Sequence, residues 1–158
     1  TRLTKVTGVQ TCALPISLLD LGCGWGPITL ALADAAPRAR VLATDVNERA
    51  LELTARNAAA AGRPGVRVLE ASALRAQLER DGARLDLVWS NPPVRIGKEA
   101  LHSLLGSWLE LLAPDGEAWL VAARNLGADS LAAWLTAEGY VAARAASSKG
   151  FRVLRVHR

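Results

Sequence analysis

The chain has 158 residues, of which 51% are hydrophobic and 22% charged, and its formal net charge is +4. A chain of this length can form one domain with a sizeable core. No apolar run is long enough to span a bilayer, and the sequence has no Cys/His cluster of the zinc-binding kind. We therefore expect neither a membrane anchor nor a metal, and the expected compartment is the cytoplasm.

The first sixteen residues are interpreted as foreign to the rest of the chain. The segment 6–16, VTGVQTCALPI, is the translation of a string of bases that we recognise as a common sequencing adapter. A natural leader is the alternative interpretation. We therefore expect a native domain over 17–158 that lacks its own N-terminus. Without Arg2 and Lys5 the count of Lys and Arg falls from 19 to 17 against 15 acids, so the net charge falls to +2.

Short apolar runs alternate with segments of helical periodicity through the rest of the chain. Strands are predicted at 18–21, 41–46, 66–69, 85–90, 118–122, 141–145 and 151–156, and helices at 27–35, 48–61, 74–80, 98–112 and 129–138. Such alternation implies right-handed crossovers and a parallel sheet covered by helices on both faces. The last two strands are joined by a short loop, so one strand should run antiparallel to the others. The prediction is an α/β fold with a doubly wound, seven-stranded, mostly parallel sheet.

The first motif follows the first predicted strand and reads D-L-G-C-G-W-G from Asp20 to Gly26. Its three glycines let the backbone turn tightly and approach a ligand without a Cβ in the way. A dinucleotide site would have the spacing G-x-G-x-x-G, and a carboxylate at Asp20 would be unfavourable beside a diphosphate. The motif therefore disfavours a nicotinamide-dependent dehydrogenase.

A second carboxylate, Asp45, ends the second predicted strand. A carboxylate at that point can accept hydrogen bonds from both hydroxyls of a ribose, as it does in nucleotide-binding sheets. It can also cap the helix that follows, a role that Asn47 can fill instead.

The second motif, Asn91-Pro92-Pro93, follows the strand predicted at 85–90. Proline cannot continue a central strand, so the chain must leave the sheet there. The side chain of Asn91 and the carbonyl of Pro92 can both accept hydrogen bonds from one planar amine and orient it, so catalysis would rest on positioning and placed dipoles. A surface turn is the plainer alternative. Both motifs lie at the carboxyl ends of strands, where a doubly wound sheet binds its ligand.

Together the two motifs resemble the cofactor and target-amine sites of class I S-adenosylmethionine (SAM) methyltransferases. The stretch 90–97, SNPPVRIG, resembles the S-N-P-P-F-H-x-G of the methyltransferase small-domain family, which includes ribosomal RNA guanine-N2 methyltransferases. The segments 121–124, VAAR, and 151–155, FRVLR, resemble its V-A-N-R and F-K-V-x-R. The resemblance covers essentially all of 17–158. Two departures are Val94 in place of the aromatic and Ala123 in place of the asparagine, and they leave the choice of target base open.

The resemblance implies SAM as cofactor, with Asp20 holding its amino group directly or through water and Val46 flanking its adenine. The residues expected to bind SAM are Asp20, Gly22, Cys23, Gly24, Gly26, Asp45, Val46, Ala71, Ser72 and Asn91. Cys23 is expected to be a small buried filler rather than a nucleophile. Trp25 either covers the cofactor or packs under the next helix. The expected catalytic group is Asn91, Pro92 and Pro93.

The resemblance also implies an RNA partner, and ribosomal RNA in particular. The residues expected to contact it are Val94, Arg95, Arg124, Lys149 and Arg152. The basic C-terminal third can face phosphate, although ordinary solvated arginines explain the same composition. Alternatives that keep the chemistry are adenine N6 or a protein glutamine amide as the target. A non-catalytic domain that binds SAM or RNA is a further alternative.

Overall fold

The computed structural model of the chain describes residues 16–158, so the predicted foreign segment lies outside the described residues except for Ile16. The helices and strands in chain order are β1 Ser17–Leu21, α1 Pro27–Ala35, β2 Arg40–Thr44, α2 Glu48–Ala60, β3 Arg67–Val68, α3 Ala71–Arg80, β4 Leu85–Ser90, α4 Lys98–Leu109, β5 Leu112–Ala123, α5 Ala128–Ala137, β6 Val141–Ser148 and β7 Phe151–His157. Short 3₁₀ turns follow β4 (Val94–Ile96) and β5 (Arg124–Leu126).

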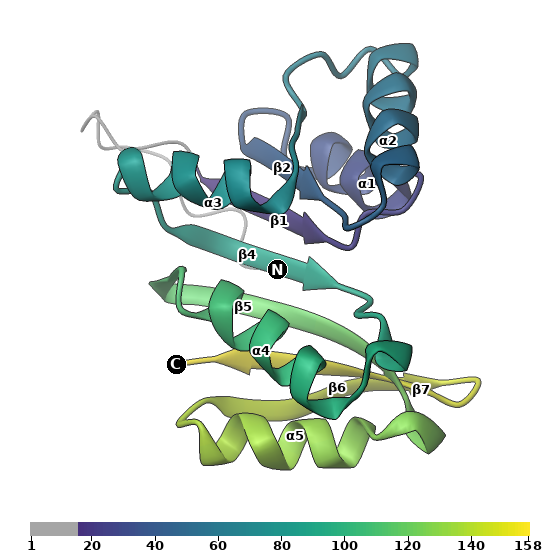
Figure 1. The fold of residues 1–158 in the computed structure, drawn as a ribbon, viewed down its shortest axis with the longest axis vertical. Coiled ribbons are helices and arrows are strands. Elements are labelled where there is room, and N and C mark those ends of the chain that lie inside the picture. Colours follow the sequence, from purple (N-terminus) through teal and green to yellow (C-terminus); the bar gives the residue numbers. More distant parts are fainter. Residues whose placement is uncertain (1–15) are drawn as a thin grey trace.

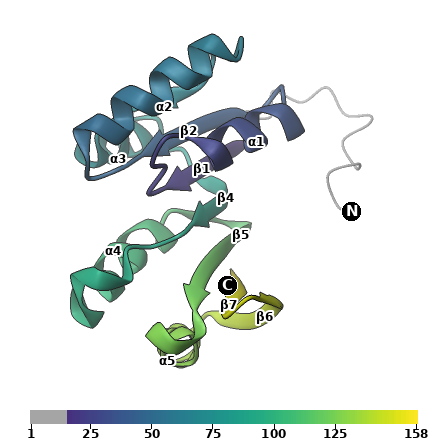
Figure 2. The same ribbon diagram turned by 90° about the vertical axis from the view of Figure 1, so that its right-hand side faces the viewer.

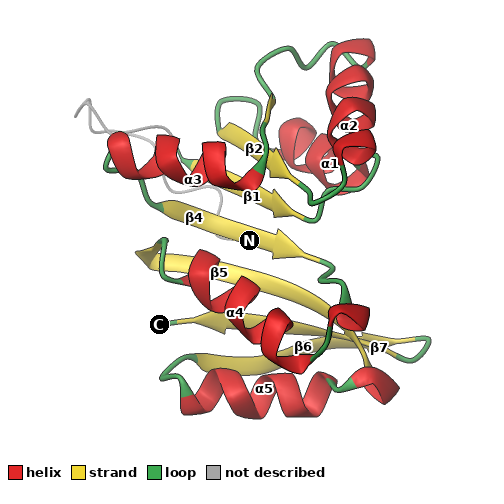
Figure 3. Cartoon of the chain, viewed as in Figure 1, coloured by secondary structure: helices red, strands yellow, loops and turns green. Residues whose placement is uncertain are grey.

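The strands form one sheet in the order β3-β2-β1-β4-β5-β7-β6. The pairs from β3 to β5 are parallel, and only β7 runs against its two neighbours, β5 and β6. This confirms the predicted mostly parallel sheet with one antiparallel strand. The order changes direction between β1 and β4, so the topological switch point lies between these two adjacent strands. Figure 3 shows β1, β2 and β4 pointing toward the same edge of the sheet.

Helices cover the two faces of the sheet unequally. On one face, leucines of α3, α4 and α5 form the larger core cluster with alternate residues of β1, β4, β5 and β7. On the other face, a smaller cluster joins α1 to β1 and β2 around Leu18, Ala33 and Val41. Figures 1 and 2 show α1 and α4 on opposite sides of the strands. Trp89 of β4 and Trp119 of β5 are half-buried and stack with parallel rings whose centroids are 5.9 Å apart.

Several predicted boundaries differ from the structure; the helix predicted at 98–112, for example, ends at Leu109. The strand predicted at 118–122 begins earlier, at Leu112, and takes in Pro114-Asp115-Gly116 through a bulge that lets Leu112 pair with Leu85 and Glu117 pair with Leu87. A Cβ at Gly116 would lie 2.6 Å from the carbonyl oxygen of Leu85, so only glycine fits this close approach. Another difference concerns α3, which begins three residues earlier than predicted, at Ala71, because the side chain of its N-cap Glu70 accepts hydrogen bonds from the N–H groups of Ser72 and Ala73.

Candidate active site at the carboxyl edge of the sheet

The two sequence motifs meet at the switch point. Gly22 follows β1 and Asn91 follows the adjacent strand β4, and a Cβ built on Gly22 would lie 3.7 Å from the Asn91 carbonyl oxygen. The Ser90 hydroxyl, fully buried, donates to the carbonyl oxygen of Leu21 at 2.8 Å and so ties the two strand ends together. Segments that lie about seventy residues apart in the sequence therefore form one edge.

A cleft of about 570 Å³, including its open mouth, lies at this edge between the ends of β1, β2 and β4 and the helices α3 and α4. Its lining residues are Leu21, Gly22, Thr44, Asp45, Val46, Ala71, Ser90, Asn91, Pro93, Leu104 and Trp108. The walls are mostly apolar and carry a few polar groups, which is the usual composition of a small-molecule site. Six of the predicted site residues are among them. The predicted residues Asp20, Cys23, Gly24, Gly26, Ser72 and Pro92 lie outside this lining.

The glycine turn, residues 22–26, is held from the side of β2. The N–H groups of Gly22 and Cys23 both donate to the Thr44 carbonyl oxygen, at 2.9 and 3.1 Å. Gly22, Gly24 and Gly26 have φ of +83°, +58° and +95°, a region that residues with a Cβ rarely adopt. The turn therefore needs glycine for its backbone shape as well as for access.

Asp45 uses both carboxylate oxygens to organise the same edge. One oxygen accepts from the Gly24 N–H and the other from the Asn47 N–H, each at 2.9 Å. The N-cap of α2 is Asn47, whose side chain accepts from the Arg49 N–H. The capping alternative for Asp45 is therefore wrong, and each of its oxygens keeps a lone pair for a ligand hydroxyl.

Asp20 lies beneath the turn and is only 1% exposed. Its carboxylate accepts a hydrogen bond from the Thr29 hydroxyl at 2.6 Å. Burial raises the pKa of Asp20, and the nearby negative charge of Asp45 raises it further, while the bonds from Thr29 lower it. A contact between Asp20 and a ligand amine stays a prediction.

Three further residues of the turn differ in their surroundings. Burial raises the pKa of the Cys23 thiol to about 11, so it is protonated near neutrality, as expected for a filler rather than a nucleophile. Gly26 is buried, and an added Cβ there would lie 3.0 Å from the Thr54 side chain, so its glycine lets α1 and α2 pack closely. Trp25 is 58% exposed, which contradicts packing under the next helix.

The Asn-Pro-Pro segment is more open. Asn91 and Pro93 are exposed and Pro92 is buried. The 3₁₀ turn that follows is closed by a bond from the Ile96 N–H to the Pro93 carbonyl oxygen at 3.3 Å. Arg95 is exposed beside it, and the side chain of Val94 lies outside the described part of the structure.

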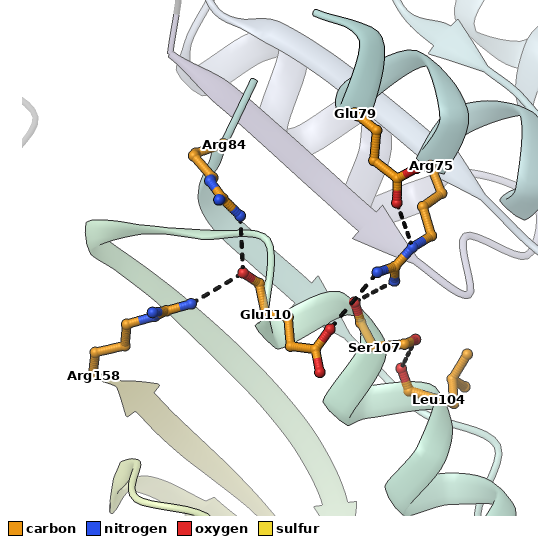
Figure 4. A network of polar contacts seen from close by, with 7 residues as sticks. All are labelled: Arg75, Glu79, Arg84, Leu104, Ser107, Glu110 and Arg158. Carbon is orange, nitrogen blue, oxygen red and sulfur yellow. Dashed lines mark hydrogen bonds and ion pairs between the residues drawn. The ribbon is translucent and has the colours of Figure 1, made fainter. Parts of the chain in front are cut away.

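The remaining wall of the cleft belongs to α3 and α4. Ala71 and Ser72 open α3, and Leu104 and Trp108 of α4, which pack with the larger core cluster, also line the cleft. Figure 4 shows how the end of α4 is anchored: the Glu110 carbonyl oxygen accepts from Arg84 at 3.1 Å and from Arg158 at 3.0 Å. The guanidinium of Arg75 binds Glu79 and the Ser107 carbonyl oxygen. These contacts fix the helix that supplies Trp108.

The residues predicted to contact RNA differ in their exposure and in their partners. Arg124 and Lys149 are exposed near the β6–β7 turn, where the Arg124 N–H donates to the Gly150 carbonyl oxygen at 2.8 Å. Arg152 instead forms an ion pair with Asp129, and its side chain is only 16% exposed. Arg152 is therefore a poor candidate for direct phosphate binding in this structure.

Within residues 16–158, the described side chains include no group of three or more His, Cys, Asp or Glu residues that could hold a metal ion. In the same part of the chain, no helix is both long and apolar enough to cross a membrane.

Comparison with known proteins gives consistent relatives. The sequence model of the methyltransferase small domain matches residues 9–155. The protein YbxB of Bacillus subtilis is 36% identical over 114 residues, which cover 72% of this chain and 55% of YbxB. A release factor glutamine methyltransferase of Xylella fastidiosa is 49% identical over 74 residues, 47% of this chain and 26% of that protein. Ribosomal RNA small subunit methyltransferase C of Salmonella choleraesuis is 35% identical over 109 residues, 66% of this chain and 30% of that protein.

Solved structures show the same fold. The ribosomal protein L11 methylase of Lactobacillus delbrueckii superposes with a TM-score of 0.74 at 20% identity, covering 93% of this chain and 72% of that chain. The 16S rRNA N2 G1207 methyltransferase of Thermus thermophilus, solved with AdoMet and guanosine, gives a TM-score of 0.69 at 21% identity, covering 90% of this chain and 37% of that chain. The chain spans between about a quarter and just over half of the three curated relatives above.

Proposed function

Because the chain belongs to the methyltransferase small domain family of SAM-dependent methyltransferases, we propose that it transfers the methyl group of SAM to the exocyclic N2 amine of a guanine in ribosomal RNA. The observation that carries the proposal is the meeting of the glycine turn and Asn91 at one cleft. A methyl donor and a target amine must lie within bonding reach of each other, and this edge offers a separate set of groups for each.

The residues on the donor side fit SAM. Asp45 keeps an acceptor lone pair on each oxygen for the two ribose hydroxyls. Val46, 87% exposed at the mouth, and Ala71 and Trp108 in the wall offer apolar surface to an adenine. A Cβ built on Gly24 would meet nothing within 4 Å, so the turn leaves open space beside it. When bound there, SAM supplies an electrophilic methyl group on a sulfonium.

On the acceptor side the chain positions the amine. The Asn91 side chain and the Pro92 carbonyl oxygen accept its two N–H groups and turn its lone pair toward the methyl group. The new C–N bond forms as the methyl–sulfur bond breaks, and the amine then loses a proton to water. Since the donor is highly reactive, orientation and placed dipoles supply the catalysis, and no side chain needs to act as a strong base.

The choice of ribosomal RNA rests on similarity and on charge. Ribosomal RNA small subunit methyltransferase C is among the relatives, and Arg95, Arg124 and Lys149 are exposed around the same edge of the sheet. Exposed arginine and lysine side chains suit RNA phosphates. The high identity over 74 residues with a release factor glutamine methyltransferase favours a protein glutamine amide as the second candidate. Its amide nitrogen is planar, so it too must be oriented toward the methyl group.

The test is methylation in vitro with labelled SAM, offering ribosomal RNA and a peptide-chain release factor in separate reactions. Digested RNA is analysed for N2-methylguanosine and N6-methyladenosine, and digested protein for N5-methylglutamine. The proposal expects N2-methylguanosine, and its yield should collapse in the Asn91→Ala variant. Label in the release factor alone would replace the proposed substrate, and label in neither would reject the transfer.

A further inference from the structure

The glycine turn cannot determine its own shape. Three of its five residues are glycines with positive φ, and glycine has the widest backbone freedom of any residue. A turn of this kind becomes one defined surface only if groups outside it fix its peptide planes. Side chains that fix these planes would control ligand binding without touching the ligand.

We propose that Thr54 and Asn57 of α2 are positioning residues that hold the glycine turn in its SAM-binding shape, an inference that rests on the proposed function. Thr54 donates from its hydroxyl to the Gly24 carbonyl oxygen at 3.0 Å. Asn57 donates from its side-chain amide to the Trp25 carbonyl oxygen at 2.7 Å. Residues three apart on a helix share one face, so α2 presents this donor pair to successive carbonyl groups of the turn.

Thr54 shows that the contact is specific. Threonine within a helix commonly bonds its hydroxyl to the carbonyl of its own preceding turn, whereas this hydroxyl reaches Gly24, thirty residues earlier. The side chain is fully buried, and its oxygen also lies 3.4 Å from the Cys23 sulfur. The same side chain fills the space beside Gly26. One residue therefore contacts three positions of the turn.

Thr54 and Asn57 together form a clamp on the glycine turn, and this clamp connects directly to Asp45, the predicted ribose acceptor. The Gly24 carbonyl is bound by Thr54, and the N–H of the same residue is bound by Asp45 at 2.9 Å. Loss of the Thr54 hydroxyl would remove the bond to this part-buried carbonyl and loosen the peptide plane between Gly24 and Trp25. The Asp45 carboxylate would then lose a fixed partner. The expected effect is therefore on SAM binding rather than on binding of the target.

The experiment measures SAM affinity by calorimetry for the wild type and for Thr54→Val, Thr54→Ser and Asn57→Ala. Thr54→Val keeps the shape but removes the donor, and we expect it to raise the Kd about 3- to 10-fold. Asn57→Ala should raise the Kd about 3-fold, and Thr54→Ser should restore wild-type affinity. The matched control is Thr136→Val on α5, which removes a hydroxyl-to-carbonyl bond of the same 3.0 Å length and should leave the Kd unchanged.

The possible outcomes distinguish a failure of this inference from a failure of the proposed function. If the wild type binds SAM, and Thr54→Val and Asn57→Ala bind it with the same Kd as the wild type, the clamp is overturned and the methyltransferase assignment stands. Absence of SAM binding in the wild type would overturn both. Thermal unfolding is followed in parallel, because a merely structural role predicts a lower Tm without a change in Kd. If Thr54→Val fails to fold, Asn57→Ala, altered at a half-buried position, decides the question.

Discussion

The two halves of the proposed site are built differently. The glycine turn forms five hydrogen bonds with Thr44, Asp45, Thr54 and Asn57, of which it donates three from its N–H groups and accepts two at its carbonyls. The segment 91–97 is exposed at most positions, and its described bonds include one of 3.3 Å within its own 3₁₀ turn. We therefore expect the proposed cofactor side to be organised before ligands bind, and the proposed target side to gain its final order when the substrate binds.

The largest change in activity should follow removal of the Asn91 side chain from the exposed segment 91–97. We expect Asn91→Ala to lower kcat about 100-fold or more, since loss of one placed hydrogen-bonding group at a transition state costs that much. The Kd for SAM should change by less than about 3-fold, a difference below 1 kcal/mol. Single-turnover methyl transfer and calorimetry measure the two quantities.

Asn91→Asp supplies the matched variant, because it keeps an acceptor at the same place. It should lose less activity than Asn91→Ala. Equal kcat in the wild type and Asn91→Ala would show that the Asn91 side chain takes no part in methyl transfer.

The second prediction compares two glycines within the organised side. Gly26→Ala forces a Cβ to 3.0 Å from Thr54 at φ +95°, so strain and overpacking should together lower the free energy of unfolding by about 2–4 kcal/mol. Gly24→Ala, at φ +58° with open space around it, should cost only the strain of about 1–2 kcal/mol. Urea unfolding measures both, and equal losses would show that packing against α2 is unimportant.

The third prediction uses the pH dependence of the buried carboxylate beneath the turn. Burial raises the pKa of Asp20 in the folded chain, so its favourable contribution to folding is present below its ordinary pKa of 3.8 and is lost as the pH rises through the folded pKa. We therefore expect Asp20→Asn to be more stable than the wild type at pH 7, with a difference that shrinks toward pH 3.5. Urea unfolding at both pH values tests the sign.

The weakest effect is expected for Arg152 of β7, one of the residues predicted to contact RNA. Asp129→Asn breaks the ion pair with Arg152, and because Asp129 is 76% exposed, the loss of stability should be below about 1 kcal/mol. The freed arginine should strengthen RNA binding about 2-fold at low salt, and this gain should vanish at high salt. Fluorescence anisotropy with a labelled RNA measures the change. Weaker RNA binding by Asp129→Asn would contradict this expectation and show that the ion pair with Asp129 helps Arg152 to bind RNA.

Much of the fold could be predicted because its signals are local. Apolar runs of four to six residues and helical periodicity define β1, β2, β4 and α2 within windows of about ten residues, and a strand–helix alternation leaves few topologies. The errors occur where a distant contact overrides a local signal. Pro114-Asp115-Gly116 reads as a turn, yet pairing with β4 draws it into β5 as a bulge.

The sheet, the family and the two motifs could be predicted from the amino-acid sequence, because they depend on periodicity and on residue types close together in the chain. The folded chain was needed to show that Thr54 and Asn57 bind the glycine turn, that Trp108 forms a wall of the cleft, and that Arg152 is paired with Asp129. Each of these contacts is a matter of distance in space. Between residues 23 to 32 positions apart, that distance is set by how the helices pack on the sheet.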